Sequence, residues 1–595
     1  MGVLYGLKVV DLVVIVAYFA IVMLIGFWAS RRVKNDEDYY LGGRRFGKGL
    51  LMMHWLCTGT HSEMAVQVAG ATARVGLGGI WYQWMWLFST PFYWLIAPVI
   101  RRLRVITTGD FFRIRYGRSL EMVYAIVALL YLIQSIALLL RGAGAAIAGA
   151  TGGDLPTEQS VILLSIIFST YVVAGGLMAA AYTDLLQGVM IIVLSVLLVP
   201  VGMQAIGGFS ALHEKLGPEM MSITAPDGAL EGHLGFIIAM SLLGLTGVVV
   251  QPHVMNATGS GKTELESRVG MTYGNFIKRV LTIAWSFTGL VAVVMYADLM
   301  SGVPAGSAEA KRLSETLFGH AIRDLLGDGW RGLMIACIVA GVTSAETFMV
   351  VGAGIFTRNF YRHVANTKTD RHYLWVGRVA AAAILVVSIA AAFLADSVTQ
   401  LVLASVQIIG LLGAAFWLGI IWRRANATAV WCSFVGSVMV WACSSANATS
   451  VEGLPGLHTL VIGLESLGDF CYLRGHTRPV EIIVMLGVQF GVLILISLVT
   501  RPQSTVQLDL FYARLLTPVG KEKEVATDRT YDAALTIGLA GKPLDFKAAE
   551  SFGYSGARRF GLEIPRLTWI DWGGFLLAWA VVAGLIVMLV WLASP

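Results

Sequence analysis

Three small residues in one apolar stretch are spaced so that they could bind a metal cation. Ala340, Thr343 and Ser344 follow an i, i+3, i+4 pattern, which places them on one face of a helix. Two hydroxyls and a nearby carbonyl could then point at one spot, and a hard cation such as Na⁺ prefers such oxygen ligands. Further carbonyls could come from residues 57–60, where a polar patch interrupts another apolar stretch. The alternative is that these small residues pack helices together, or that the hydroxyls bond to carbonyls of their own helix.

Ionisable side chains also occur inside the apolar stretches. Such groups are costly at membrane depth, and they usually mark an ion or substrate pathway. The alternative for each is a position near a helix end, from which the side chain reaches water. The ionisable residues of this kind are His54, His61, Glu63, Arg141, Asp184, His253 and Glu346.

The composition indicates a membrane setting for these residues. Of the 595 residues, 57% are apolar and 13% are charged, about half of the roughly 25% charged residues of soluble domains. This composition excludes a soluble enzyme, a disordered chain and a secreted disulfide scaffold. The net charge of +6 does not indicate a nucleic-acid partner, because the basic residues lie in short loops between apolar stretches. We therefore expect a lipid bilayer around the chain.

The apolar stretches predict an all-α polytopic membrane protein with about 14 transmembrane helices. The loops that alternate onto one side hold 33 of the 43 basic residues, which places those loops in the cytoplasm. Both termini then lie outside, and the expected location is the plasma membrane, or the inner membrane of a bacterium. The predicted segments are 8–29, 48–73, 79–100, 120–150, 159–178, 181–206, 234–256, 277–299, 331–357, 373–395, 398–422, 427–446, 480–499 and 569–592.

Two interrupted segments suggest how the helices are grouped. The second is interrupted at 55–63 by small and polar residues, and the seventh at 247–253, where Pro252 removes a backbone donor. Because these interruptions are five segments apart, they fit two inverted repeats of five helices. The predicted divisions are an N-terminal extra helix with a cytoplasmic loop (1–47), the first repeat (48–206), the second repeat (207–424), two peripheral helices (425–500), a cytoplasmic amphipathic segment (501–568) and a last helix (569–595).

Several short motifs follow one another along the chain. They are D-Y-Y-L-G-G-R at 38–44, H-S-E at 61–63, T-T-G-D-F-F at 107–112, R-Y-G at 115–117, G-G-L at 175–177, T-D-L-L-Q at 183–187 and the stretch 340–361. Through these motifs, and in this order, residues 8 to 500 resemble the sodium:solute symporter family. That family includes sodium-coupled carriers of glucose, proline, pantothenate and sialic acid.

The resemblance implies a fold of two inverted five-helix repeats and Na⁺-driven uptake by alternating access. The family's sodium site uses two carbonyls of the broken second segment, and a carbonyl and two hydroxyls of the ninth. In this chain the matching positions are Cys57, Thr60, Ala340, Thr343 and Ser344. Asp184 matches an acidic position that some members use in a second sodium site, or to relay sodium to the cytoplasm.

The resemblance does not assign the solute. At positions where sugar carriers of the family have Asn, Gln and Glu, this chain has Gly59, Met64 and Gln83. We therefore expect a small molecule that is a sugar, an amino acid or a carboxylate. Arg141 could bind a carboxylate through a bidentate fork, or it could be the counter-ion of Glu346. The candidate solute-binding residues are His61, Glu63, Gln83, Arg141, Gln251, His253 and Glu346.

Two other functions remain alternatives, and an enzyme is not predicted because no catalytic triad or metal cluster appears in the sequence. A proton-coupled carrier is one, since Glu346 and His61 near the predicted cation site could titrate. A transporter-like solute sensor is the other. Such a sensor would need a signalling domain, and the polar stretch 501–566 is short for one.

Overall fold

The structure is a computed structural model of the 595-residue chain. It describes residues 3–31, 42–171, 176–225, 232–304, 307–365, 367–395, 397–445, 455–471, 478–521, 561–563 and 566–594. Within these ranges the chain is almost entirely helical, and its one small sheet pairs β1 (Val3–Leu4) with β2 (Leu7–Lys8) in antiparallel fashion.

The helices of the first part of the chain run as far as residue 221. They are α1 (Val9–Ser30), η1 (Gly42–Arg44), α3 (Lys48–Thr58), α4 (Ser62–Val75), η2 (Gly76–Ile80), α5 (Trp81–Trp84), α6 (Thr90–Leu103), α7 (Thr108–Tyr116), α8 (Arg118–Ala150), α9 (Thr157–Tyr171), α10 (Gly176–Ile206), α11 (Gly208–Lys215) and α12 (Pro218–Met221).

The helices of the second part begin at residue 234. They are α13 (Leu234–Gly247), η3 (Val248–Val250), α14 (Pro252–Gly259), α15 (Glu264–Met295), α16 (Ala297–Met300), α17 (Ala308–Leu325), α18 (Trp330–Ile355), the π-helix η4 (Phe356–Tyr361), α19 (Arg362–Val364), α20 (Asp370–Leu394), α21 (Val398–Gly410), α22 (Gly413–Ile421), α23 (Ala427–Ser445), α24 (Pro455–Phe470), α25 (Arg478–Val499), α26 (Thr505–Leu516) and α29 (Trp569–Ala593).

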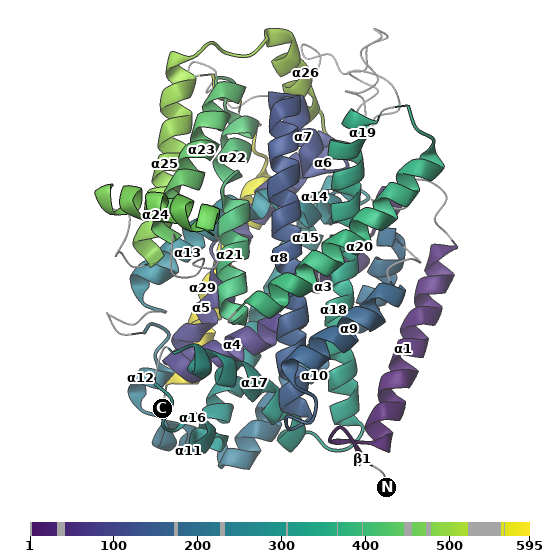
Figure 1. The fold of residues 1–595 in the computed structure, drawn as a ribbon, viewed down its shortest axis with the longest axis vertical. Coiled ribbons are helices and arrows are strands. Elements are labelled where there is room, and N and C mark those ends of the chain that lie inside the picture. The colour runs from purple at the N-terminus through teal and green to yellow at the C-terminus, as the bar shows by residue number, and fades with distance from the viewer. Residues whose placement is uncertain are drawn as a thin grey trace.

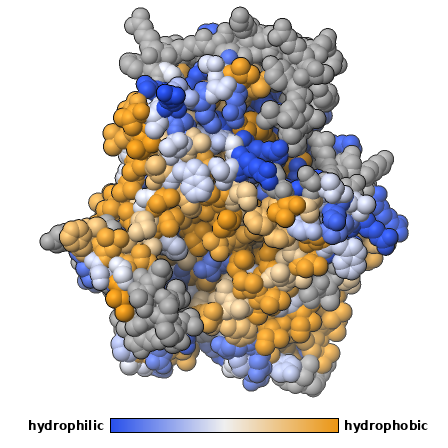
Figure 2. Space-filling model, turned by 45° about the horizontal axis from the view of Figure 1, so that its top comes forward, coloured by the Kyte–Doolittle hydropathy of each residue, from blue (hydrophilic) through white to orange (hydrophobic). Residues whose placement is uncertain are grey.

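The helices confirm a multi-pass membrane protein. Among the described residues, ten helices are long and apolar enough to cross a membrane, or eleven if the bent pair of α13 with η3 and α14 counts as one span. Hydrophobic residues dominate the middle of the visible face, whereas hydrophilic residues gather toward its top and bottom (Figure 2). The expected total of about 14 spans remains a prediction, because several elements in the predicted segments, such as α6 and α9, are short.

Helix α8 lies at the centre of the bundle (Figure 1) and packs against α4, α7, α9, α17, α18, α20 and α21. Glycines permit the closest of these approaches. A Cβ atom on Gly149 of α8 would clash with the backbone of Thr316 in α17, and one on Gly319 of α17 would clash with the carbonyl of Ala146. Small residues on both helices therefore let the two backbones touch, as is common for helices in lipid.

Two short amphipathic helices lie at opposite ends of the bundle. Helix α17 lies at one end, near the start of α1 and the end of α29, and α26 lies at the other (Figure 1). Helix α26 buries Phe511 and Tyr512, and the Tyr512 hydroxyl donates to the Gly419 carbonyl at 3.0 Å. The start of α1 and the end of α29 therefore lie toward the same end of the bundle. Most of the remaining predicted segment 501–568 lies outside the described residues.

The structure corrects one predicted boundary. The predicted segment 277–299 begins too late, because α15 already begins at Glu264. The Thr263 hydroxyl caps the first turn while the Glu266 carboxylate accepts from the Thr263 N–H, which is a capping box. Lys278 and Arg279 therefore lie in the middle of a long buried helix and not at its start.

Substituting Gly319 tests the contact between α8 and α17. We expect Gly319→Ala to destabilise the protein by about 1–3 kcal/mol, because the added Cβ would clash with backbone and not with a movable side chain. The measurement is the thermal unfolding of the purified protein in detergent. Gly327→Ala is the matched control, since a Cβ there meets nothing within 4 Å. Equal melting temperatures for the two variants would contradict the close contact.

Candidate functional site

The first break in a helix separates α3 from α4. Helix α3 ends at Thr58, and the N–H groups of Gly59 and Thr60 still donate to the carbonyl of Cys57. His61 is extended, with φ −120° and ψ 165°, and α4 starts at the next residue. The Gly59 carbonyl, which no longer belongs to a helix, accepts a short hydrogen bond from the Nζ of Lys278 in α15.

The second break separates α13 and η3 from α14, and the two pieces are bent by 61°. Gln251 is extended, with ψ 128°, and Pro252 opens α14 at a position where its missing N–H costs nothing. The freed carbonyl of Val250 accepts from the Tyr124 hydroxyl of α8 at 2.9 Å. Each break is therefore stabilised by a polar side chain from a neighbouring helix.

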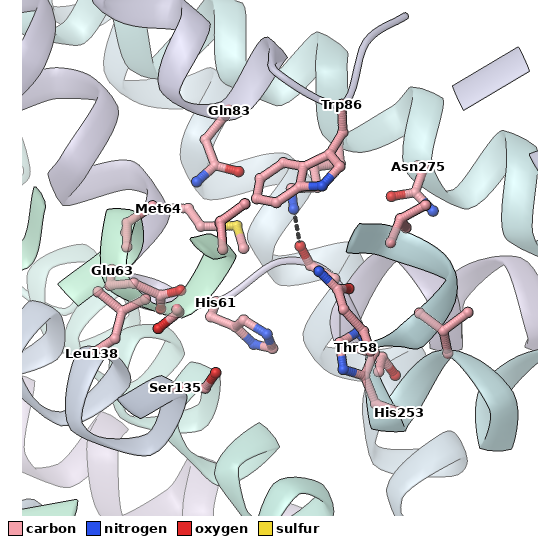
Figure 3. Close-up of a pocket in the computed structure, with 18 of the residues that line it drawn as sticks. Thr58, His61, Glu63, Met64, Gln83, Trp86, Ser135, Leu138, His253 and Asn275 are labelled. Atoms are coloured by element: carbon pink, nitrogen blue, oxygen red, sulfur yellow. Dashed lines mark hydrogen bonds between the residues drawn. The ribbon is translucent and has the colours of Figure 1, made fainter. Parts of the chain in front are cut away.

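Both breaks face one partly open cavity, whose empty space is about 770 Å³ when the part open to solvent is included. Figure 3 shows His61 and Glu63 of the first broken helix near Ser135 of α8, with Gln83 and Trp86 on the other side of the same space. The cavity is lined by Trp55, Thr58, Gly59, His61, Glu63, Met64, Gln83, Trp86, Tyr93, Tyr131, Ser135, Leu138, Leu139, Val248, Gln251, His253, Val254, Asn275, Lys278, Arg279, Phe348, Val402, Ser405 and Val406.

The structure brings together most of the predicted solute-binding residues. His61, Glu63, Gln83, Gln251 and His253 all line the cavity. The side chain of Glu346 lies outside the described part of the structure.

Arg141 does not line the cavity, although the sequence placed it among the solute-binding candidates. Leu138 and Leu139 form part of the α8 wall, and Gly142 packs directly against Glu63. Arg141 points elsewhere, and its Nη1 donates to the Ala392 carbonyl of α20 at 3.0 Å. The sequence predicted that Arg141 lies within an apolar helix. It could not predict which side of α8 faces the cavity.

Two cations in the cavity wall were missed by the sequence analysis. Lys278 and Arg279 of α15 are 4% and 1% exposed. The Arg279 Nη1 donates to the Gln83 carbonyl at 2.9 Å, and both cationic groups lie near the Trp86 ring, Lys278 at 5.5 Å and Arg279 at 6.0 Å from its centroid. The T-x-x-E capping box at 263–266 was the signal that could have placed them in a helix.

Several buried polar atoms of the cavity wall have no hydrogen-bond partner among the described residues. In native proteins such atoms usually have a partner, so these atoms point to a ligand or to water in the cavity. The unpartnered atoms are the Nδ1 of His61, the Oε2 of Glu63, the Oε1 of Gln83, the Nδ1 of His253 and the Nε of Arg279.

The predicted sodium ligands come from two elements that meet behind this cavity. Helix α18 carries Ala340, and a Cβ on its neighbour Gly341 would lie 3.0 Å from the backbone nitrogen of Ser62 at the start of α4. The hydroxyls of Thr60 and Ser62 are buried and, within the described ranges, have no hydrogen-bond partner. These oxygens lie beside the predicted carbonyl ligands of the break, and the sodium site itself stays a prediction. The side chains of Thr343 and Ser344 are outside the described residues.

A second, smaller cavity of about 390 Å³ adjoins the same break. It lies between α4, α10, α15 and α18, so it is in contact with the segments that hold the predicted sodium ligands. Its lining residues are Thr60, His61, Ser62, Ala65, Ile191, Leu194, Ser195, Trp285, Phe318, Met334, Cys337, Ile338 and Gly341.

Asp184 of α10 faces α3 and lines neither cavity. Its Oδ2 lies 2.7 Å from the Nδ1 of buried His54, and its backbone carbonyl accepts from the Cys57 Sγ at 3.2 Å. The pair therefore ties α10 to α3, the first half of the broken helix. A role for Asp184 in a second sodium site or a relay remains a prediction.

A polar cluster of Arg74, Ser314, Glu315 and Thr399 joins α4, α17 and α21 at the α17 end of the molecule. Arg74 donates from Nη1 to the Ser314 hydroxyl at 2.6 Å and from Nη2 to the Thr399 hydroxyl at 3.5 Å. The buried Glu315 carboxylate accepts from the N–H of Val398 at 2.8 Å. Because α4 and α21 both line the large cavity, this cluster links two of its walls.

Comparisons with known proteins agree with this arrangement. A model of the sodium:solute symporter family matches residues 39–436. Human sodium/glucose cotransporter 4 is 28% identical over 228 residues, which are 37% of this chain and a third (33%) of the human protein's length. The sodium/glucose cotransporter of Vibrio parahaemolyticus is 23% identical over 470 residues, covering 73% of this chain and 84% of that protein.

The fold also matches a solved transporter. A Na⁺-coupled sialic acid symporter in a substrate-bound outward-open state superimposes with a TM-score of 0.65 and 18% identity. The match covers 84% of this chain and 99% of that one. At this identity the likeness concerns the fold.

Glu315 should make the stability of the protein depend on pH. Burial raises its pKa from 4.5 to about 7, against the opposing influence of Arg74 and, more weakly, of Arg141. Between those two pH values the native state holds a proton that the unfolded chain has released. The contribution of Glu315 to stability is thus fully present below about pH 4.5 and is lost as the pH rises through about 7.

The comparison that isolates this effect is Glu315→Gln, which is neutral at every pH and keeps an oxygen that can accept from Val398. We expect its melting temperature to vary less than that of the wild type between about pH 5 and pH 8. Glu309→Gln, an exposed position on the same helix, should behave like the wild type. Unchanged pH dependence in Glu315→Gln would show that the carboxyl group does not titrate in this range.

Proposed function

The chain belongs to the sodium:solute symporter family, and on that premise we propose that it is a sodium-coupled secondary active symporter that imports a small organic solute by alternating access. The observation that carries the proposal is the meeting of two broken helices at one cavity, where buried polar atoms are left for a ligand. Transporters bind solute and ion at such discontinuous helices near the middle of the membrane.

We place the protein in the plasma membrane with about 14 spans, both termini outside and a core of two inverted repeats. The first repeat comprises the broken helix α3 and α4 with α6, α8, α9 and α10. The second comprises the broken helix α13 and α14 with α15, α18, α20 and the pair α21 and α22. Each set of five begins with an interrupted helix, which supports the repeat.

The coupling ion is Na⁺, bound by the carbonyls of Cys57, Thr60 and Ala340 and by the hydroxyls of Thr343 and Ser344. The contact of Gly341 with the start of α4 supports this assignment, because it brings α18 to the break. The His54–Asp184 pair lies beside Cys57 and is suited to a second sodium site or to the release of the ion.

Transport requires that the cavity opens to one side at a time. The hydrogen bonds of Arg74 and Glu315 between α4, α17 and α21 close the α17 side, so they must break when the cavity opens there. Each Na⁺ that moves inward gains about 2.3 kcal/mol per 100 mV of membrane potential. One ion thus supports roughly fifty-fold accumulation of a neutral solute before any sodium gradient is added.

Sodium binding can be measured without knowing the solute. We expect NaCl to raise the melting temperature of the purified protein above its value in choline chloride, because a ligand that binds the native state stabilises it. The double variant Thr343→Ala with Ser344→Ala should need a sodium concentration at least about tenfold higher for the same shift, since it lacks two oxygen ligands. In vesicles, uptake should require an inward sodium gradient.

Ser437→Ala is the matched control, because this buried hydroxyl of α23 donates to the Ser433 carbonyl of its own helix. An unchanged sodium response in the double variant would disprove the ligand assignment. Uptake that persists without sodium but collapses with a proton uncoupler would make the protein proton-coupled. Solute binding without uptake would make it a sensor.

A further inference from the structure

Arg279 is a buried cation that has no anionic partner in the described part of the chain. It is 1% exposed and forms no salt bridge there. We propose that the solute supplies the counter-ion, and that the solute is a small hydroxylated carboxylate of the sugar-acid kind. This inference rests on the proposed function, because it names the substrate class of the same cavity.

The described part of the cavity wall holds more basic than acidic side chains. Its ionisable residues other than histidine and tyrosine are Lys278, Arg279 and Glu63. An uncompensated charge away from water is strongly unfavourable, and buried arginines are therefore normally paired. A carboxylate on the solute would give Arg279 a counter-ion.

The geometry assigns the carboxylate to Arg279 in preference to Lys278. The Lys278 ammonium is already engaged by the carbonyl of Gly59. Arg279 donates from Nη1 to the Gln83 carbonyl and also hydrogen-bonds to Tyr93, while its Nε is buried and unpartnered in the described structure. A planar guanidinium with a free N–H donor suits a carboxylate oxygen, and such charge-assisted bonds are about twice as strong as neutral ones.

The other polar atoms of the wall are suited to hydrogen-bond with hydroxyl groups of the solute. The free Oε2 of Glu63 and Oε1 of Gln83 are hydrogen-bond acceptors, and His61 and His253 each present an unpartnered Nδ1. A simple fatty or aromatic acid would leave these atoms without partners, which is costly in a buried site. Hydroxyl groups can donate to the acceptors, while the Trp86 and Phe348 rings offer apolar surface for the carbon skeleton.

The test compares acids with their neutral counterparts of the same size. The purified full-length protein in NaCl is melted with glucuronate, galacturonate or gluconate, and in parallel with glucose, galactose or glucitol. We expect stabilisation by at least one acid and none by its neutral counterpart. Stabilisation by a neutral sugar alone, or by none of the acids, would overturn the inference.

The role of Arg279 is tested with two variants. Arg279→Gln should raise the dissociation constant of the bound acid at least about tenfold, because it removes the charged donor. Arg279→Lys keeps the charge and should retain part of the affinity. If Arg279→Gln binds the acid as tightly as the wild type does, the assignment of Arg279 is wrong. The comparison in the wild type stands even if a variant does not fold.

The same experiment separates this inference from the proposed function. Repeating the melts in choline chloride asks whether the acid needs sodium to stabilise the protein. An acid that stabilises equally in both salts would support the substrate class while opposing sodium coupling. A neutral sugar that stabilises only in NaCl would support sodium coupling while rejecting the anionic solute.

Discussion

The structure depends on one constraint, which is that a backbone carbonyl released from a helix inside a membrane must find another partner. Helices α3 and α4 are interrupted at Gly59, and α13 and α14 at Gln251. An interrupted helix in lipid is unfavourable unless other protein groups hydrogen-bond to the carbonyls that the interruption frees. Here Lys278 donates to the Gly59 carbonyl and Tyr124 to the Val250 carbonyl, so the neighbouring helices make both breaks possible.

The same constraint explains where polarity collects. Because the breaks need polar partners, α8 and α15 bring tyrosine, lysine and arginine side chains to the centre of an otherwise apolar bundle. The glycines of α8 and α17 allow these two helices to touch backbone to backbone. The cavity is thus a by-product of the way in which the interrupted helices are stabilised, and its wall is polar for the same reason.

The sequence predicted the helical membrane architecture, the family, both helix breaks and five residues of the cavity wall. These features depend on local signals such as apolar length, proline and short motifs. It missed Lys278 and Arg279 as cavity residues, because a charged pair at the start of a predicted span reads as a helix end until the capping box at 263–266 is taken into account. It placed Arg141 at the right depth, but only tertiary packing decides which way α8 is turned. The sequence of helix α17 is polar enough to resemble a loop. The contact of its Glu315 with Val398 of α21 could therefore not be predicted.

The bond from Lys278 to Gly59 has a consequence for the cooperativity of transport. The Gly59 carbonyl lies between Cys57 and Thr60 in the chain, so a sodium ion held by those two residues would experience repulsion from the ammonium nearby. An anion on Arg279 would offset that repulsion. By thermodynamic reciprocity each ligand would then tighten the binding of the other. Sodium without its solute would be held only weakly. The transport cycle would thereby be protected against carrying the ion alone.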